Sequence, residues 1–251
     1  METMRKSEKY IVGSERDHVY RLLYEMIPQD DKYLHMRLSG AVDDVCHDVF
    51  FLTHDDAKGL SRIWMGYGRH KNAVCNWGAV FTPDEYRGRG YCGRTLECSF
   101  EYIDSMETPP PALFCSAAGM AVVYGKYGFV PALKGTTYGP MYRPCGDSPK
   151  SFAEFCESYY TKADSLVAID AHFGWRNEID CLLKFALLDA GEEFGIGGVK
   201  ALNELLMIAP HRAKIVLTND NKCVGWMLDG IPQLHPKYRG LGILDATKFD
   251  T

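Results

Sequence analysis

The sequence lacks the patterns that would place its cysteines in disulfides or around a metal. Nine cysteines occur among 251 residues, an odd number, and they are scattered without a Cys-x-x-Cys pair. A disulfide framework and a zinc site are therefore not expected, and we predict no metal site. Because thiols persist where the environment is reducing, this cysteine usage predicts a cytoplasmic protein.

Long apolar runs and an excess of positive charge are also missing. No apolar run approaches the ~18 residues of a membrane span, and residues 1–9 are charged, so we expect neither a membrane partner nor a signal peptide. The formal net charge of −5 argues against nucleic-acid binding and agrees with a cationic amine substrate. The hydrophobic content of 46% is ordinary for a globular protein and supplies a full core.

What the sequence does contain is a glycine-rich basic loop between a predicted strand and a predicted helix. The strand covers Ala73–Phe81, the loop Arg87–Gly93 and the helix Tyr91–Asp104. Loop amides, glycines that allow close approach and a helix N-terminus together favour an anion. Each hydrogen bond from a backbone amide to a charged oxygen is worth about 1.5–3 kcal/mol, so three or four of them can hold a pyrophosphate. The pattern predicts a phosphorylated cofactor.

Two familiar phosphate loops do not fit this segment. A P-loop requires Gly-Lys-Ser/Thr at the start of the helix, where this chain has Gly90-Tyr91-Cys92. The spacing Gly88-x-Gly90-x-x-Gly93 matches a dinucleotide fingerprint. However, it lies near residue 90 rather than at the start of a βαβ unit, and two arginines crowd it. A Rossmann oxidoreductase is therefore not expected.

The loop closely resembles the Arg-x-x-Gly-x-Gly/Ala acetyl-CoA loop of the GNAT superfamily of N-acetyltransferases. Arg87, Gly90 and Cys92 stand at its three diagnostic positions, and the string from Val80 to Tyr91 is similar to a common variant of the motif. The resemblance implies acetyl-CoA as cofactor and a primary amine, on a small molecule or a protein, as acceptor. It implies these cofactor-binding residues: Val80, Phe81, Thr82, Arg87, Gly88, Arg89, Gly90, Tyr91, Cys92, Gly93 and Ser116.

A second motif lies downstream. The run from Tyr124 to Phe129 is similar to the family's Tyr-x-x-x-Gly-Phe signature, and the resemblance implies that Tyr124 is catalytic and protonates the leaving thiolate. The alternative is that Tyr124 only packs on the sheet. Many family members carry Asn seven positions earlier, where this chain has Ala117. The resemblance then implies that the pantetheine arm is held by backbone alone or by Ser116.

The general base cannot be identified from the sequence. The Ala73–Phe81 strand contains no acid, and we expect Asp84 and Glu85, in the loop, to be solvated. His70 and Asn76 remain candidates for holding a water molecule. Aromatic residues in strands are more often core than pocket, which is the expectation for Trp64, Tyr67 and Trp77. Cys92 and Cys115 are expected to be structural.

The order of predicted elements indicates an α/β (α+β) domain with a mixed, mostly antiparallel central sheet flanked by helices. It matches the GNAT layout over residues 8–143. The predicted elements are a helix that starts at Ser14–Asp17 with Ser14 as cap, strands Val49–Thr53, Leu60–Tyr67 and Ala73–Phe81, helix Tyr91–Asp104, strand Ala112–Cys115, helix Gly119–Tyr127, and strands Val130–Leu133 and Thr136–Tyr142.

After a predicted linker, Arg143–Pro149, residues 151–251 form an extra α/β region. The predicted elements are helices Ser151–Thr161, Trp175–Leu188 and Val199–Ile208 and a hairpin of Ala213–Thr218 with Cys223–Leu228. The segment His235–Ile243 echoes Pro83–Tyr91. Two interpretations stay open: a partial second GNAT-like domain, or a surface turn. Few residues follow the echo, so we expect no second catalytic site.

Two functions from different classes are consistent with these motifs. One is an N-acetyltransferase. The other is a catalytically degenerate module of the same fold that binds CoA or a protein partner, which the absent Asn and base favour. The intact loop and Tyr124 favour the enzyme. A homodimer through exposed strands late in the sheet is left open, and the acceptor is not named by any motif.

Overall fold

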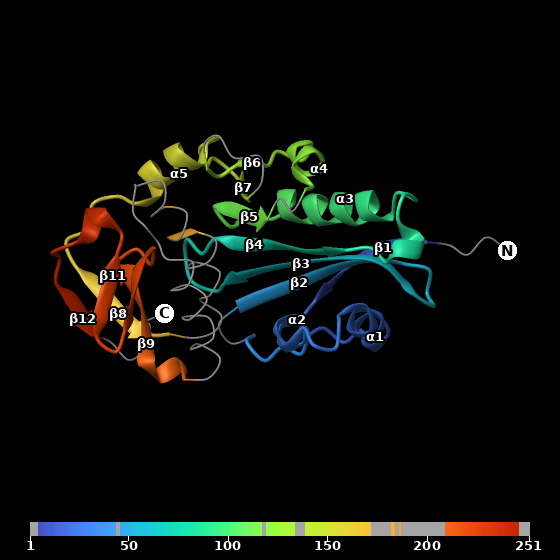
Figure 1. Cartoon of the computed structure of the whole chain (residues 1–251), viewed down its shortest axis with the longest axis horizontal. Coiled ribbons are helices and arrows are strands. Elements are labelled where there is room, and N and C mark those ends of the chain that lie inside the picture. Colours follow the sequence, from blue (N-terminus) through green and yellow to red (C-terminus); the bar gives the residue numbers. More distant parts are fainter. Residues whose placement is uncertain are drawn as a thin grey trace. The chain divides into compact units, whose positions relative to one another are not determined.

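The computed structural model (Figure 1) describes residues 5–43, 46–116, 119–133, 139–171, 182–183, 186 and 209–245. The chain divides into two compact units, Met1–Tyr67 with Trp77–Pro109, and Gly68–Asn76 with Pro110–Thr251, which we describe separately. Their mixed α+β architecture, with mostly antiparallel sheets flanked by helices, confirms the predicted fold class. None of the described helices has both the length and the apolar character that a membrane crossing requires.

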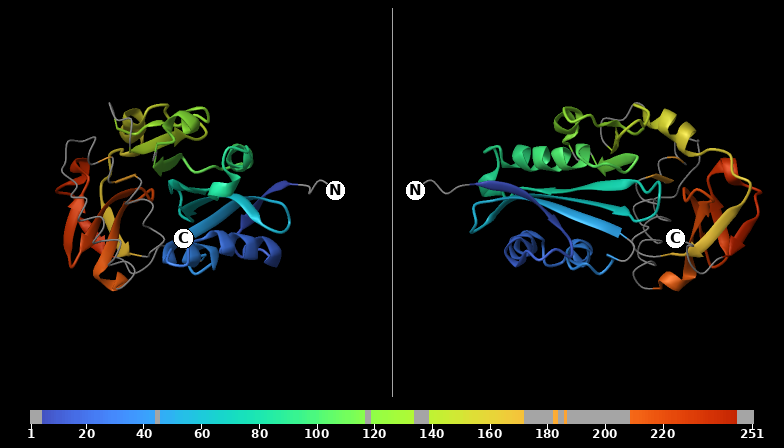
Figure 2. Two further views of the ribbon diagram at one scale, coloured as in Figure 1. Left: turned by 45° about the vertical axis from the view of Figure 1, so that its right-hand side comes forward. Right: turned by 180° about the vertical axis from the view of Figure 1, so that it is seen from behind.

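The first unit is a sheet with helices on both faces. Helices α1 and α2 cover one face and α3 the other (Figures 1 and 2). Strands β1 and β2 are antiparallel along the whole of β1. The strand order is β1 (Lys6–Ile11), β2 (Cys46–His54), β3 (Gly59–Gly68) and β4 (Cys75–Phe81), and the helices are α1 (Asp17–Met26), α2 (Lys32–Leu38) and α3 (Tyr91–Asp104).

Helix α1 packs one face on the sheet through four buried residues at helical spacing: Val19, Leu22, Leu23 and Met26. The predicted cap is wrong. Arg16 is the N-cap and makes no side-chain cap bond, whereas the Ser14 hydroxyl donates to the Ile11 carbonyl at 2.6 Å. Ser14 therefore closes the turn after β1 instead of starting the helix. Strand β1 and helix α2 were not predicted.

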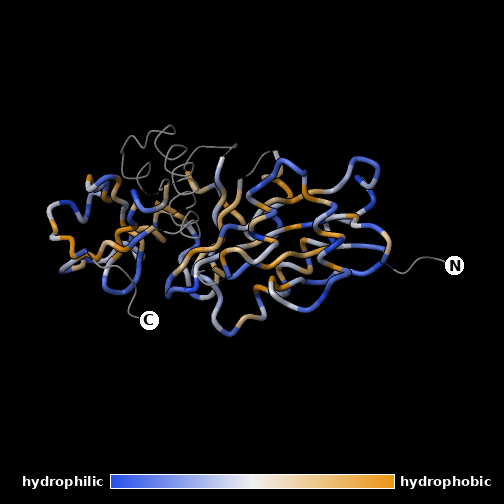
Figure 3. Tube along the Cα trace, turned by 90° about the horizontal axis from the view of Figure 1, so that it is seen from below, coloured by the Kyte–Doolittle hydropathy of each residue, from blue (hydrophilic) through white to orange (hydrophobic). Residues whose placement is uncertain are grey.

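Strands β2 and β3 form the predicted hairpin and run through the core. Nearly all their residues are buried, and Figure 3 shows hydrophobic residues along the strands and polar residues at the turns. The turn is closed by the Asp55 carboxylate, which accepts from the backbone amides of Ala57 and Lys58 at 3.2 and 2.9 Å. Such a side-chain bond replaces backbone pairing at a tight turn.

Trp64 and Trp77 belong to the core of the first unit, as predicted. Trp64 is 2% exposed, and its indole nitrogen donates to the Asp48 carboxylate at 2.8 Å. The same buried carboxylate accepts from Arg37 at 3.3 Å. Trp77 is fully buried and stacks on Phe100 with 5.2 Å between ring centroids. Both indoles therefore stabilise the sheet and its helices rather than line a substrate pocket.

The second unit contains the start of β4 and a small antiparallel group of strands. Strand β4 pairs in parallel with β5 (Ala112–Ser116) at Cys75 and Asn76. Strand β7 (Pro140–Pro144) pairs antiparallel with both β5 and β6 (Val130–Pro131). The predicted linker is wrong at its start, because Arg143 and Pro144 are paired in β7. Helix α4 covers Ala121–Gly125 and is shorter than predicted.

Helix α5 (Phe152–Tyr159) begins with a capping box. The Ser151 hydroxyl accepts a hydrogen bond from the backbone amide of Glu154, and the Glu154 carboxylate accepts one from the backbone amide of Ser151. After α5 the chain forms a second sheet. Its hairpin of β9 (Ala213–Thr218) and β10 (Cys223–Leu228) was predicted. Its other strands, β8 (Leu166–Asp170), β11 (Ile231–Leu234) and β12 (Ile243–Asp245), were not. The predicted helices Trp175–Leu188 and Val199–Ile208 fall almost wholly outside the described residues. The sheet order is β11 (Ile231–Leu234), β10 (Cys223–Leu228), β9 (Ala213–Thr218), β8 (Leu166–Asp170) and β12 (Ile243–Asp245).

The echoed segments form the same local turn. Each begins with a short 3₁₀ helix, η1 (Asp84–Tyr86) or η5 (Pro236–Tyr238). An extended arginine follows, at φ −64° for Arg87 and −62° for Arg239. A left-handed glycine comes next, at φ 72° for Gly88 and 86° for Gly240. The preceding strands also have the same order, β1–β2–β3–β4 and β8–β9–β10–β11. After the glycine the two segments differ, since α3 follows one and β12 the other.

Candidate functional site

The end of β4 is distorted at Ala79. Its φ of 51° lies in the left-handed region, which costs a residue with a Cβ about 1–2 kcal/mol. Arg62 of β3 holds this conformation from a position that is 4% exposed. Its Nη1 donates to the Ala79 carbonyl at 2.5 Å, and its Nε donates to the Met26 carbonyl at 3.2 Å. Arg62 therefore joins the end of α1 to the distorted strand.

The distortion fixes the direction of the next amide. A trans peptide places its N–H and C=O on opposite sides, so the Val80 N–H points away from the Arg62 guanidinium that holds the Ala79 carbonyl. Burial lowers the pKa of Arg62 to about 10, and the charge of Asp31 opposes that shift. At neutral pH Arg62 remains protonated and can make both bonds. Sequence analysis placed Val80 at the site but missed Arg62, which no motif contains.

The loop after β4 is organised by its own side chains. The Thr82 hydroxyl donates to Ser61 on β3 at 3.0 Å, and the Thr82 carbonyl accepts from Arg87 Nε at 3.1 Å. Arg87 also pairs with Asp84 at 2.8 Å on the exposed surface. The predicted solvation of Asp84 is confirmed, since 85% of its side chain is exposed. Phe81 lies under the Arg62 guanidinium, 5.3 Å from its ring centroid.

Gly88 and Gly90 have backbone conformations that suit glycine, with φ of 72° and 80°. A Cβ built at Gly88, Gly90 or Gly93 would meet no atom within 4 Å outside its chain neighbours. The space above the loop is therefore open to a ligand. Arg89 lies 6.0 Å from the Tyr86 ring centroid, beside this space. An open, glycine-lined and basic loop fits the phosphates that the sequence predicted.

Gly90 is also the N-cap of α3, and the first turn of this 14-residue helix carries no acidic side chain. Tyr91 is 4% exposed and packs against Tyr86, with 6.3 Å between the ring centroids. Burial raises the pKa of the Cys92 thiol, while a side-chain hydrogen bond with Thr82 opposes the shift. The Cys92 thiol therefore ionises less readily than an ordinary cysteine, in agreement with its predicted structural role. The free amides at the start of α3 complete the predicted anion site.

The remaining predicted residues belong to the second unit and are described there by themselves. Tyr124 is 5% exposed on α4, and its ring lies 6.0 Å from that of Phe129. Ser116 is the last residue of β5 and pairs with Pro140. Ala117 lies outside the described residues. The catalytic role of Tyr124 and the cofactor role of Ser116 remain predictions.

The candidate water-holding residues differ in character. Burial lowers the pKa of His70 to about 3, so this histidine, in the β3–β4 connection, is neutral at physiological pH and too weak a base for an ammonium group. Asn76 lies on β4 beside Phe114 of β5. Burial raises the pKa of the Cys115 thiol to about 12, which supports its predicted structural role.

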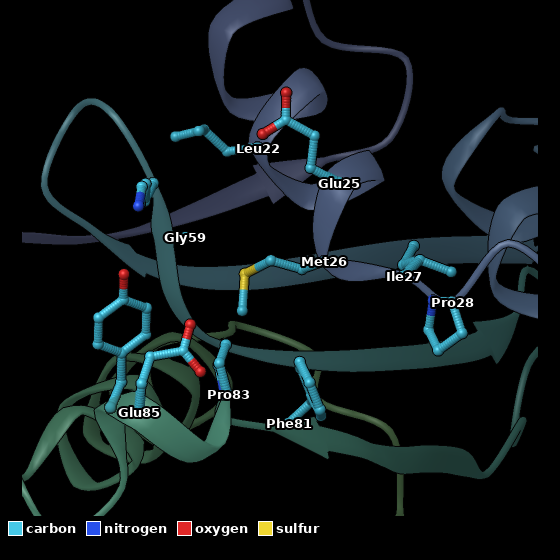
Figure 4. Close-up of a pocket in the computed structure, with 11 residues that line it drawn as sticks. Leu22, Glu25, Met26, Ile27, Pro28, Gly59, Phe81, Pro83 and Glu85 are labelled. Carbon is cyan, nitrogen blue, oxygen red and sulfur yellow. The ribbon is translucent and has the colours of Figure 1, made fainter.

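A pocket of about 420 Å³ opens in the first unit (Figure 4). It is lined by the end of α1 and the residues after it, the start of β3, the end of β4, and η1. Phe81 is the only one of its residues that the motifs had placed at the site. Glu25, Met26 and Lys58 were missed because they come from separate elements that only the fold brings together.

One group in the described residues has the composition of a metal site. Ligand atoms of His18, His54 and Asp56 lie within 4.8 Å of one another. However, His54 Nε2 lies 2.6 Å from the Glu8 carboxylate, and its Nδ1 accepts from the Asp56 amide at 3.1 Å. Both ring nitrogens are thus hydrogen-bonded within the protein, and Glu8 and Asp56 are further paired with Arg16 and Lys6. The group anchors β1 to the hairpin.

Comparisons with known proteins add a structural likeness. No model of a protein family matches the chain, and no curated protein matches it. Solved structures do match. The matches include GNAT-type acetyltransferases. An acyl-CoA N-acyltransferase from Pseudomonas aeruginosa is 18% identical, with a TM-score of 0.40, and the match covers 56% of this chain and 99% of that one.

Two Escherichia coli proteins match similarly. ElaA is 15% identical, with a TM-score of 0.42, over 56% of this chain and 99% of its own. YhbS, a GNAT family N-acetyltransferase solved in complex with CoA, is 11% identical, with a TM-score of 0.41, over 59% of this chain and 86% of its own. The printed name of YhbS is that of the family that the loop motif resembles.

Proposed function

We propose that the protein is an acetyl-CoA-dependent N-acetyltransferase that acts on a primary amine. The observation that carries the proposal is the segment from Ala79 to Gly90. A strained residue held by a buried arginine is followed by two left-handed glycines and a helix N-terminus open to a ligand. Strain of this kind concentrates at functional sites.

The loop residues fit the cofactor that the motif implies. Amides from Gly88 to Gly93 and the N-terminal turn of α3 would hold the pyrophosphate, and Arg87 and Arg89 would neutralise it. When bound, acetyl-CoA supplies an acetyl group activated as a thioester. The remaining predicted cofactor residues of the first unit, from Val80 to Thr82 with Tyr91 and Cys92, would shape the rest of this site. Ser116 of the second unit is proposed, from the motif alone, to contact the pantetheine arm.

The chain's own groups would supply the other requirements of acyl transfer. The Val80 N–H, turned by the Ala79 distortion, would donate to a carbonyl oxygen that gains negative charge. Tyr124 would supply a proton to the leaving sulfur, a role that its motif supports. His70 does not serve as the base, because its lowered pKa leaves it a weak proton acceptor.

A matched pair of variants tests the loop. Asn and Asp are isosteric and both tolerate the left-handed region, so Gly90→Asn and Gly90→Asp impose similar backbone strain and differ in charge. A ligand at 100 times its Kd raises stability by about 2.7 kcal/mol. We expect acetyl-CoA to raise the Tm of wild type clearly, of Gly90→Asn less, and of Gly90→Asp not at all.

The outcome also separates the two candidate functions. Stabilisation by acetyl-CoA, followed by acetylation of an amine, supports the enzyme. Stabilisation without turnover over a broad amine panel would favour a degenerate CoA-binding module. If acetyl-CoA and CoA leave the Tm of wild type unchanged, the proposal is wrong.

A further inference from the structure

The pocket of the first unit differs in chemistry from the loop beside it. Its volume of about 420 Å³ lies within the ~300–1,000 Å³ range of small-molecule sites. This is room for a compact organic group. In Figure 4, side chains of α1 line one side of the pocket and Pro83 and Glu85 line the opposite side.

The base of the pocket is apolar. Leu22 and Met26 of α1 and Ile27 after it are at most 8% exposed. Phe81 and Pro83 continue this surface along the end of β4. Such a lining favours a ligand with a hydrocarbon or aromatic body, because contact removes apolar area from water on both sides.

The charged groups of the lining are mainly acidic. Glu25 comes from α1 and Glu85 from η1, and both are exposed. In the part of the chain that the structure describes, neither carboxylate makes a hydrogen bond or an ion pair, so both are available to a ligand. Lys58 is the third charged residue, which leaves the lining with a net charge of −1.

The sign of charge changes sharply along η1. Glu85 lines the pocket, whereas Arg87, two residues later, begins the basic glycine loop. An anionic phosphate is therefore attracted to the loop, and a cation to the pocket. Arg62 fixes the two sides of the pocket relative to each other by donating to Met26 and Ala79. The geometry is thus set before a ligand arrives.

We infer that this pocket binds the acceptor of the proposed reaction as a primary ammonium ion on an apolar body. The inference rests on the proposed function, because the ligand is an acceptor only if the protein transfers an acetyl group. The binding preference itself follows from the apolar base and the two unpaired carboxylates. An anionic acceptor is disfavoured by the same carboxylates.

Calorimetric titration of the full chain with three probes of similar size tests the inference. The probes are 2-phenylethylamine, the neutral 2-phenylethanol and the anionic 3-phenylpropionate, each at pH 7. We expect the amine to bind about tenfold more tightly than the alcohol, which corresponds to about 1.4 kcal/mol, and the acid to bind more weakly than both.

Variants locate the binding. Glu85→Gln and Glu25→Gln should each raise the Kd of the amine about 3- to 10-fold and leave that of the alcohol unchanged, in the range of one lost charge-assisted contact. Glu97→Gln is the control, because Glu97 is an exposed carboxylate of α3 outside the pocket. Gly59→Ala changes shape without charge, since its Cβ would lie 2.1 Å from Met26 Sδ, and should weaken amine and alcohol alike.

The failures of the two proposals are distinguishable. Acetyl-CoA binding with no preference of the pocket for the amine, or equal effects of Glu85→Gln and Glu97→Gln, would refute this inference and leave the acetyltransferase proposal standing. Amine binding that depends on Glu85 in a protein that does not bind acetyl-CoA would uphold the amine pocket and refute the enzymatic role. N-acetylation of 2-phenylethylamine would support both.

Discussion

Replacing Arg62 by methionine tests whether the distortion of β4 is functional. Methionine fills a similar volume but donates no hydrogen bond to the Ala79 or Met26 carbonyl. With its carbonyl released, Ala79 can leave the left-handed region, and the Val80 N–H turns with it. We expect turnover to fall in a protein that remains folded.

The stability change should be moderate because two large effects oppose each other. Two hydrogen bonds from a charged donor are worth about 3–6 kcal/mol. Burial of the guanidinium lowers the pKa of Arg62 from 12.5 to about 10, a penalty of about 3 kcal/mol at 1.36 kcal/mol per pH unit. The difference leaves a loss of about 0–3 kcal/mol, which a domain with about 5–15 kcal/mol of stability tolerates.

The turnover of the folded variant should also fall. Removal of one donor to a developing negative charge costs about 10²–10³ in kcat in enzymes that use such donors. Because the strand can still sample the distorted conformation, we expect a smaller effect for Arg62→Met, a fall in kcat of about 10- to 100-fold. The Kd of acetyl-CoA should change little, since the glycine loop does not depend on Arg62.

The assay combines product formation with amide spectroscopy. N-acetylated amine is quantified chromatographically at saturating acetyl-CoA, and the Val80 amide resonance is followed on addition of the cofactor. Ala79→Gly provides the rescue, because glycine adopts positive φ without strain. The double variant Arg62→Met/Ala79→Gly should recover part of kcat. If Arg62→Met keeps wild-type kcat, or if the double variant recovers none of the loss while Ala79→Gly alone is active, Arg62 does not position the Val80 amide.

Three further predictions concern single groups. Tyr124→Phe keeps the packing on Phe129 and removes the hydroxyl, so kcat should fall about 10²–10⁴-fold with acetyl-CoA affinity unchanged; unchanged kcat would assign Tyr124 to packing alone. The folded pKa of His70, about 3, lies below its unfolded value of 6.5. The contribution of neutral His70 to the free energy of unfolding is therefore fully present above pH 6.5 and is lost as the pH falls, by about 2 kcal/mol at pH 5. The free energy of unfolding in urea should depend less on pH in His70→Gln than in wild type. Ser151→Ala removes the capping box of α5 and should cost about 1 kcal/mol in urea unfolding, whereas a loss equal to that of Ser158→Ala would exclude a specific cap.

Local chemistry made the strand, loop and helix around Arg87–Gly93 predictable. Glycine spacing, the proline-containing turn and apolar alternation act within a few residues, so the sequence alone indicated the ends of β4 and α3. Strand β1 failed this test, because four of its six residues are exposed and its pairing with β2 spans about forty residues. Pairing with β2 makes this segment a strand, and its own residues carry no pattern that predicts one.

The site residues divide in the same way. The residues proposed from a contiguous motif were predicted, whereas Arg62, Glu25 and Lys58 were not, because their places in the structure depend on contacts between separate elements. Arg62 carries no sequence signal beyond a cation inside an apolar strand. A charged residue at such a position needs buried partners, and that is the one observation that could have marked it.

The repeated turn shows what makes a loop of this kind a ligand site. Arg87-Gly88 and Arg239-Gly240 adopt the same backbone conformation after strands in the same order, which agrees with the partial repeat, one of the two interpretations that the sequence left open. Only the first turn leads into a helix, whose free amides face the loop. The second leads into β12, which pairs in parallel with β8 and uses its backbone groups in the sheet. The glycine turn is thus shared, and the helix that follows it distinguishes the proposed anion site from a structural connection.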